Sequence, residues 1–183
     1  TVYRATQLSI DRTVALKVFK AATAKHWDTV LQEARAAAAL QHPNVCSVYA
    51  VDASEGALGI AMEFVEGPTL RELINDGPLP SDQVADLAQQ MASGLSVAHA
   101  AHISHGDLKP ANVMVGETGK VKVLDFGLAK LAQDAADEAP HNEATELETA
   151  TAALTGEGTV MGTAPYMSPE QLQGKPVDSR TDI

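Results

Sequence analysis

The chain is poor in cysteine, aromatic residues and long apolar runs. Cys46 is the only cysteine, so no internal disulfide bond can form, and a reducing, cytoplasmic location is expected. Aromatic residues make up 4% of the sequence, so aliphatic side chains and alanine must fill most of the core. No apolar run approaches the roughly 18 residues of a membrane-spanning helix, so we expect no membrane contact by this segment.

Basic residues are also scarce. The 13 Lys and Arg against 24 Asp and Glu give a net charge of −11. This balance argues against nucleic acid or an anionic membrane surface as the main partner. Residues 131–160 hold seven of the acidic residues and no Lys or Arg.

Hydrophobic periodicity predicts strands in the first part of the chain and helices in the second. We expect strands at residues 2–8, 13–19, 45–51 and 58–65, with a helix at residues 27–40. Helices should follow at residues 69–75 and from residue 81, with Ser81 as N-cap, and short strands at residues 113–115 and 121–124. Residues 133–159 have no clear period and predict a surface segment. This order favours a two-lobed α+β fold, hinged near Glu66 and Gly67.

Two short stretches carry the chemistry, His-Gly-Asp-Leu-Lys-Pro-Ala-Asn at residues 105–112 and Asp-Phe-Gly at residues 125–127. Asp107 could accept a proton from an attacking hydroxyl, and Lys109 could neutralise a transferred phosphoryl group. Asn112 and Asp125 could give oxygens to Mg²⁺, which needs few protein ligands when phosphates and water complete its shell. Phosphoryl transfer needs positioning and charge neutralisation rather than covalent help.

Lys17 is a second candidate cation. It alternates with Val14 and Leu16, so it lies on the face opposite these larger aliphatic residues. A lone strand lysine is most often simply exposed. With an anionic partner such as Glu33, on the predicted helix, it could instead contact nucleotide phosphates.

Three histidines lie near the first stretch, but they do not predict a zinc site. His99 and His102 fall where the long helix should end, and no cysteine pair accompanies them. We expect His105 to pack in the core.

Taken in order, these motifs resemble the bacterial, eukaryotic-like (Hanks-type) serine/threonine protein kinases over nearly the whole chain. Residues 14–17 resemble the lysine strand of that family, Glu33 its helix-C glutamate, and residues 105–112 its catalytic loop. Residues 162–170 resemble the substrate side of its activation segment, and residues 178–183 the start of its helix F.

The resemblance implies ATP-dependent phosphoryl transfer to Ser or Thr hydroxyls of protein substrates, with ATP and Mg²⁺ as cofactors. The implied catalytic residues are Asp107, Lys109, Lys17 and Glu33, and the implied metal ligands are Asn112 and Asp125. The implied contacts to ATP come from Val2, Ala15, Lys17, Met62, Glu63, Phe64, Val65 and Met114. Thr163 would bond to Asp107 and Lys109, which supports a Ser or Thr acceptor.

The resemblance also implies a domain organisation. Residues 1–65 would be an N-lobe without its glycine-rich loop, and residues 66–183 the hinge end and part of a C-lobe, with an activation segment at 125–170. We therefore expect truncation at both ends and little or no activity of residues 1–183 alone, within an active parent protein. An inner-membrane anchor in that parent is left open by the sequence.

One departure concerns regulation. Gly106 stands where regulated relatives carry an arginine that pairs with an activation-segment phosphate. We therefore expect that loop phosphorylation is not strictly required.

Two alternatives remain open at this point. Small-molecule phosphotransferases acting on aminoglycosides or choline share the His-Gly-Asp pattern with a following Asn, although Lys109 and residues 162–170 favour a protein kinase. A non-catalytic, pseudokinase-like binding module is the other, disfavoured because Lys17, Asp107 and Asp125 are all present.

Overall fold

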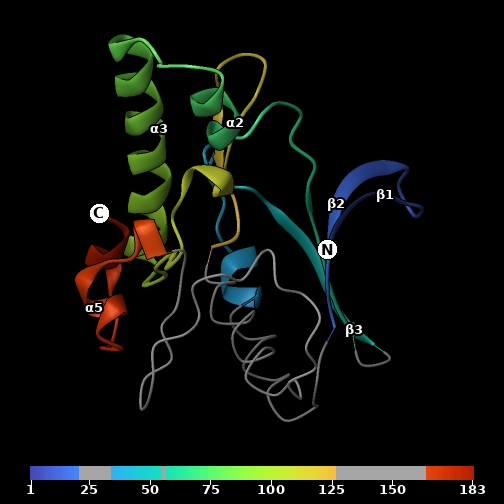
Figure 1. The fold of residues 1–183 in the computed structure, drawn as a ribbon. Coiled ribbons are helices and arrows are strands. Elements are labelled where there is room, and N and C mark those ends of the chain that lie inside the picture. The colour runs from blue at the N-terminus through green and yellow to red at the C-terminus, as the bar shows by residue number, and fades with distance from the viewer. Residues whose placement is uncertain (21–33, 55–56, 127–163) are drawn as a thin grey trace, which may run out of the picture.

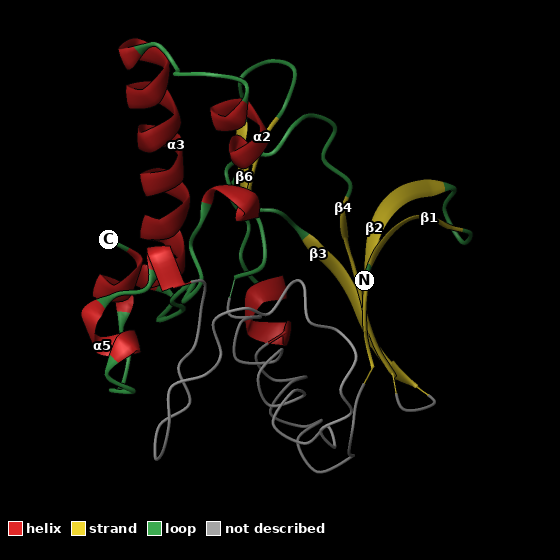
Figure 2. Cartoon of the chain, in the orientation of Figure 1, coloured by secondary structure: helices red, strands yellow, loops and turns green. Residues whose placement is uncertain are grey.

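The structure is a computed structural model that describes residues 1–20, 34–54, 57–126 and 164–183. A sheet of long strands and a mainly helical part lie side by side and are joined by the chain after β4 (Figures 1 and 2). The predicted two-lobed α+β architecture is thereby confirmed.

Four antiparallel strands form the sheet, in the order β1-β2-β4-β3. Their bounds are β1 Val2–Gln7, β2 Arg12–Lys20, β3 Val48–Ser54 and β4 Ala57–Glu63. The register sets Ala15 opposite Met62 and Lys17 opposite Ile60. Directly opposed residues share a face of a sheet, and Ile60 and Met62 are buried. Lys17 therefore extends from the face that packs inward.

The strand pair formed by β3 and β4 differs from its prediction at both ends. Val45 forms an isolated parallel bridge with Val123, and β3 begins only at Val48. The residues on either side of Val45 form the hydrogen bonds of this bridge: the Val123 N–H donates to the Asn44 carbonyl and the Cys46 N–H to the Val123 carbonyl, both at 2.9 Å. Val45 itself is buried, so its apolar character reflects burial rather than membership of β3. At the other end, β4 stops at Glu63, two residues before the predicted boundary, and leaves Phe64 and Val65 in the connection.

The connection to the helical part turns at Gly67. Its φ of +138° lies in a region that L side chains rarely adopt, and a Cβ atom there would lie 2.2 Å from the Val115 carbonyl oxygen. A glycine is therefore required where the connection passes this strand. It is followed by α2, Leu70–Asn75, whose N-cap Thr69 forms a capping box with Glu72.

The longest helix is α3, Ser81–Ala100. Leu87, Leu95 and Ala98 are buried along it, as the helical spacing predicts. The expectation that Ser81 is its N-cap is wrong. Pro80 occupies that position in extended conformation, with φ −56° and ψ 145°, and Ser81 is already helical. Proline fits there because its locked φ and missing N–H cost nothing before the first turn.

The core of the helical part lies where α3 meets a small hairpin. Its strands are β5, Val113–Val115, and β6, Val121–Val123. Val113, Val121 and Val123 are 0% exposed. Burying each valine stabilises the fold by at most about 1.5–3 kcal/mol. This cluster therefore fixes the hairpin in place, with Asn112 just before it and Asp125 shortly after it.

The remaining described elements are short. They are η2 Pro110–Asn112, η3 Ala164–Tyr166, α5 Pro169–Leu172 and η4 Ser179–Asp182. Of the predicted helix at 27–40, residues 34–38 are helical, and the earlier residues, Glu33 included, lie outside the described part, as do residues 133–159 and Thr163. Among the described residues, none of the helices has the length and apolar character needed to span a membrane.

Candidate active site

His105 holds the loop that follows α3 against the core. It is 1% exposed and meets the Phe126 ring edge-on, with 5.0 Å between ring centroids. Its Nδ1 atom accepts the Asp107 backbone N–H at 3.2 Å, so Nε2 carries the proton and donates to the Leu124 carbonyl at 2.7 Å. Burial lowers the pKa of His105, which keeps this neutral form. The expectation that His105 packs in the core is confirmed.

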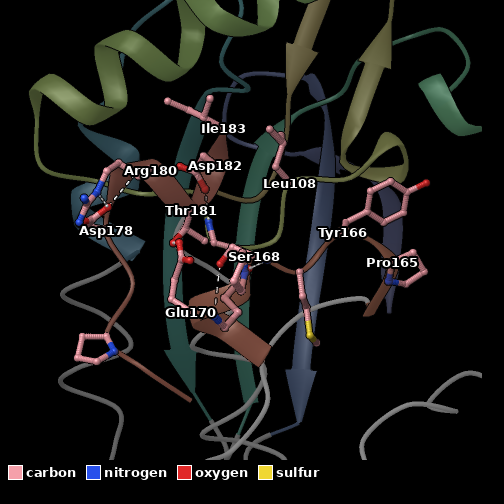
Figure 3. Close-up of a pocket in the computed structure, with 15 residues that line it drawn as sticks. Leu108, Pro165, Tyr166, Ser168, Glu170, Asp178, Arg180, Thr181, Asp182 and Ile183 are labelled. Carbon is pink, nitrogen blue, oxygen red and sulfur yellow. Dashed lines mark hydrogen bonds and ion pairs between the residues drawn. The ribbon is translucent and has the colours of Figure 1, made fainter. Parts of the chain in front are cut away.

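Asp182 fixes the same loop from the opposite end of the chain (Figure 3). Its carboxylate, 1% exposed, accepts the backbone N–H groups of His105 at 2.7 Å and Gly106 at 2.8 Å, and also the His99 Nε2–H at 2.8 Å. Sequence reasoning did not identify Asp182. It lies 77 residues from His105, and a single aspartate in a short polar segment gives no signal of such a contact.

Asp107 lies at the centre of a cluster of polar side chains on this loop. The Lys109 Nζ atom is 2.7 Å from its Oδ2 atom. The Asn112 side-chain N–H donates to the Asp107 carbonyl oxygen at 2.8 Å and to Oδ2 at 3.3 Å. Because the amide nitrogen of Asn112 faces Asp107, its Oδ1 atom points elsewhere and can serve as a ligand. The structure thus brings together three of the residues predicted from the motif.

Lys17 and Asp125 form the contact that links the sheet to this cluster. The Lys17 Nζ atom lies 2.8 Å from Asp125 Oδ2, across 108 residues of sequence. Both side chains are about one-fifth exposed, at 22% and 21%, so solvent weakens the pair and its contribution to stability is about 1 kcal/mol or less. Asp125 adopts a left-handed φ of +61°. The ion pair matters mainly for position, because it sets Lys17 of β2 beside Asp125, shortly after the β5–β6 hairpin.

Asn112 and Asp125 were predicted to hold Mg²⁺, and their chemistry fits that ion. The Leu124 N–H donates to the Asn112 carbonyl at 2.9 Å, so the two candidate ligands lie on adjacent segments. They offer one neutral and one charged oxygen. Within the described ranges no three or more His, Cys, Asp or Glu gather to hold a metal. A site of this kind would need phosphate and water oxygens to complete six ligands, as Mg²⁺ commonly does.

The residues implied to contact ATP through its base are distributed over both parts. Val2 is opposite Lys17 in the ladder, and Ala15 is opposite Met62, so they share the inward face of the sheet. Met114 belongs to β5 and forms a bridge with Thr69.

The strand end at residues 62–65 was implied to contact the base through its backbone. The Glu63 N–H is already engaged, donating to the Ser47 carbonyl at 2.8 Å. The Arg4 guanidinium lies over the Phe64 ring, with its Cζ atom 4.9 Å from the ring centroid. Val65 is half-buried.

Gly106 has a left-handed φ of +77°. A Cβ atom there would meet nothing within 4 Å, so backbone conformation rather than space favours glycine at this position.

A cavity of about 720 Å³ borders the loop. Gly106 and Leu108, the two neighbours of Asp107, contribute to its lining together with residues 165–171 (Figure 3). The Gln171 side chain closes this region by donating to the Gly106 carbonyl at 2.6 Å. The cavity thus lies beside the residue predicted to accept the proton.

Comparison with known proteins places these features in one family. The profile of the protein kinase domain matches residues 1–183. The chain is 43% identical over 191 residues to serine/threonine-protein kinase pkn3 of Myxococcus xanthus, covering 100% of this chain and 32% of that protein. It is 38% identical over 190 residues to serine/threonine-protein kinase PknB of Mycobacterium leprae, covering 100% of this chain and 28% of that one. The chain thus spans about a third of the length of these relatives, and it belongs to the protein kinase domain family.

Proposed function

We propose that the protein containing this chain transfers the γ-phosphoryl group of ATP to Ser or Thr hydroxyls of protein substrates. The observation that supports this most is the 2.8 Å ion pair between Lys17 and Asp125, next to the loop on which Lys109 and Asp107 lie 2.7 Å apart. Each pair sets a cation against a carboxylate, and the Leu124 N–H bond to the Asn112 carbonyl holds the segments that carry Asp125 and Asp107 side by side. Such an arrangement suits a reaction whose main requirement is the neutralisation of phosphate charge.

Each side chain has a role in this proposal. Asp107 accepts the proton of the attacking hydroxyl at its carboxylate, with Asn112 N–H and Lys109 orienting that group. Lys109 also faces the transferred phosphoryl group. Lys17 contacts the nucleotide phosphates, and Glu33, outside the described residues, would hold its ammonium group.

The remaining roles concern binding. Asn112 and Asp125 would hold Mg²⁺, which supplies positive charge to the phosphate oxygens when bound. The base of ATP would lie against Val2, Ala15 and Met114, with the backbone of residues 62–65 at its edge. The acceptor segment of the substrate would enter the cavity beside Gly106 and Leu108.

The test uses the full-length protein with labelled ATP, a generic protein substrate and a set of small alcohols. Asp107→Asn should reduce protein phosphorylation by about 100-fold or more, the range that loss of a positioned base produces. Asp76→Asn, at an exposed position after α2, is the matched control and should leave the rate unchanged. Label appearing on the small alcohols instead of protein, or a fully active Asp107→Asn variant, would overturn the proposal.

A further inference from the structure

Lys122 forms an ion pair that the roles above do not use. It lies on β6 between Val121 and Val123, both 0% exposed, so its side chain extends from the opposite face of the hairpin. On that face its cross-strand neighbour is Met114. The Lys122 Nζ atom lies 2.8 Å from Glu63 Oε2, and the two side chains are 19% and 25% exposed. This pair joins the helical part to the last residue of β4.

A short connecting segment, residues 45–47, lies between the two partners. On one side it bonds to β6, where the Cys46 N–H donates to the Val123 carbonyl at 2.9 Å. On the other side it bonds to Glu63, whose carboxylate accepts the Ser47 N–H at 3.2 Å. Lys122 Nζ also donates to the Val45 carbonyl at 3.4 Å. The Glu63 N–H also donates to the Ser47 carbonyl at 2.8 Å, so backbone hydrogen bonds already join β6, residues 45–47 and Glu63. The ion pair adds a direct side-chain contact between the two outer members of this junction.

Both partners are close to opposite ends of the proposed nucleotide. Glu63 lies in the backbone stretch, residues 62–65, that would contact the base of ATP. Lys122 is three residues before Asp125, at the phosphate end, and Val123 and Leu124 between them are held by backbone bonds to Asn44 and Asn112. A change at the junction would thus alter the span between the two ends.

We propose that Lys122 is a positioning residue that, through Glu63, sets the distance between the base-binding strand end and Asp125. This inference rests on the proposed function, because it assumes that one nucleotide occupies both ends. A ligand that engages both ends at once should depend on the pair, whereas a ligand confined to the base end should not.

The test compares MgATP with adenosine, which lacks phosphates, on the full-length protein. Lys122→Met should weaken MgATP binding and raise the KM for ATP by about five- to tenfold, while adenosine binding changes by less than about twofold. The fold-decrease in kcat at saturating ATP should be smaller than the fold-increase in KM. Lys120→Met, at an exposed position on the same hairpin, is the control and should change none of these values.

A charge exchange separates positioning from direct contact. The double variant Lys122→Glu with Glu63→Lys restores an ion pair and should recover most of the MgATP affinity. If Lys122 instead touched the nucleotide, the exchange would leave affinity low, and that result would overturn the proposal. Equal losses for adenosine and MgATP would overturn it as well.

Folding and the proposed function are controlled separately. Should Lys122→Met lack a cooperative thermal transition, Glu63→Gln replaces it, because it keeps an acceptor for the Ser47 N–H and removes the charge. It should show the same selective loss of MgATP affinity, more weakly, and unchanged MgATP affinity would contradict the inference. If the wild-type protein bound MgATP but phosphorylated no protein, the proposed function would fail while the binding comparison still decided the role of Lys122.

Discussion

Removal of the Asp182 carboxylate should destabilise the loop that carries Asp107 more than any change at an exposed site. Asp182 accepts two backbone N–H groups, from His105 at 2.7 Å and Gly106 at 2.8 Å. Hydrogen bonds to a charged group contribute about 1.5–3 kcal/mol each, so Asp182→Ala should reduce the free energy of unfolding by about 3–6 kcal/mol. For a domain of this size, that corresponds to a fall in Tm of about 6–24 °C.

Asp182→Asn makes the experiment informative even if the alanine variant unfolds. One amide oxygen can still accept a backbone N–H, but the amide nitrogen must then face a donor, so we expect about half of the loss. Displacement of the loop should also lower kcat, since Asp107 is the next residue after Gly106.

The assay is thermal unfolding of the full-length protein, followed by single-turnover phosphorylation. Asp178→Asn is the matched control from the same segment, because it keeps an oxygen to accept the Arg180 N–H at the start of η4 and loses only the charge of a surface ion pair with Arg180, whose side chains are 54% and 85% exposed. An Asp182→Ala variant no less stable than the control would refute the claim that this carboxylate anchors the loop.

Three further predictions concern titration and backbone conformation. Burial lowers the pKa of His105 below its ordinary value of 6.5, so below that pH the unfolded chain binds a proton that the folded chain does not. The free energy of unfolding should therefore fall as the pH drops below 6.5, by at most about 1.4 kcal/mol per pH unit. Urea unfolding between pH 5 and 8 checks this, and a flat profile that His105→Gln does not alter would contradict it. Burial, with the charges of Glu63 and Asp125, raises the pKa of the Cys46 thiol to about 12. A thiol reagent at pH 8 should therefore label the native protein far more slowly than the urea-unfolded protein. Equal labelling rates would count against this. Gly67→Ala should destabilise the protein by about 2–4 kcal/mol more than Gly77→Ala. Both glycines have a positive φ, but a Cβ atom would meet a carbonyl oxygen only at position 67. Equal Tm values for the two variants would show that the close approach is relieved at no cost.

The candidate site could be predicted as far as its residues are close in sequence. The loop at residues 105–112 fixes Asp107, Lys109 and Asn112 within six positions, and the structure brings their side chains together. Alternation along β2 correctly separated Lys17 from Val14 and Leu16. The order of strands and helices was sufficient for the two-lobed fold.

Boundaries and caps were less predictable. Ser81 has the side chain of a good N-cap, yet the chain begins the helix one residue earlier, at the conformation that Pro80 already favours. Val45 has strand-forming character, but it pairs with Val123 of β6 and not with β4, the partner of β3. In both cases the local pattern was compatible with two arrangements, and packing selected one.

The sequence by itself determined which residue types were available and which of them share a face, because strand and helix periods are local properties. It could not determine which face would be covered, since that depends on the layer packed against it. Lys17 meets Asp125 only because the folded chain sets β2 beside the segment that follows β6, and Asp182 reaches the loop only because η4 lies beside it. The tertiary structure decided these contacts, together with the Lys122–Glu63 pair, because each joins segments whose separation along the chain leaves no local trace.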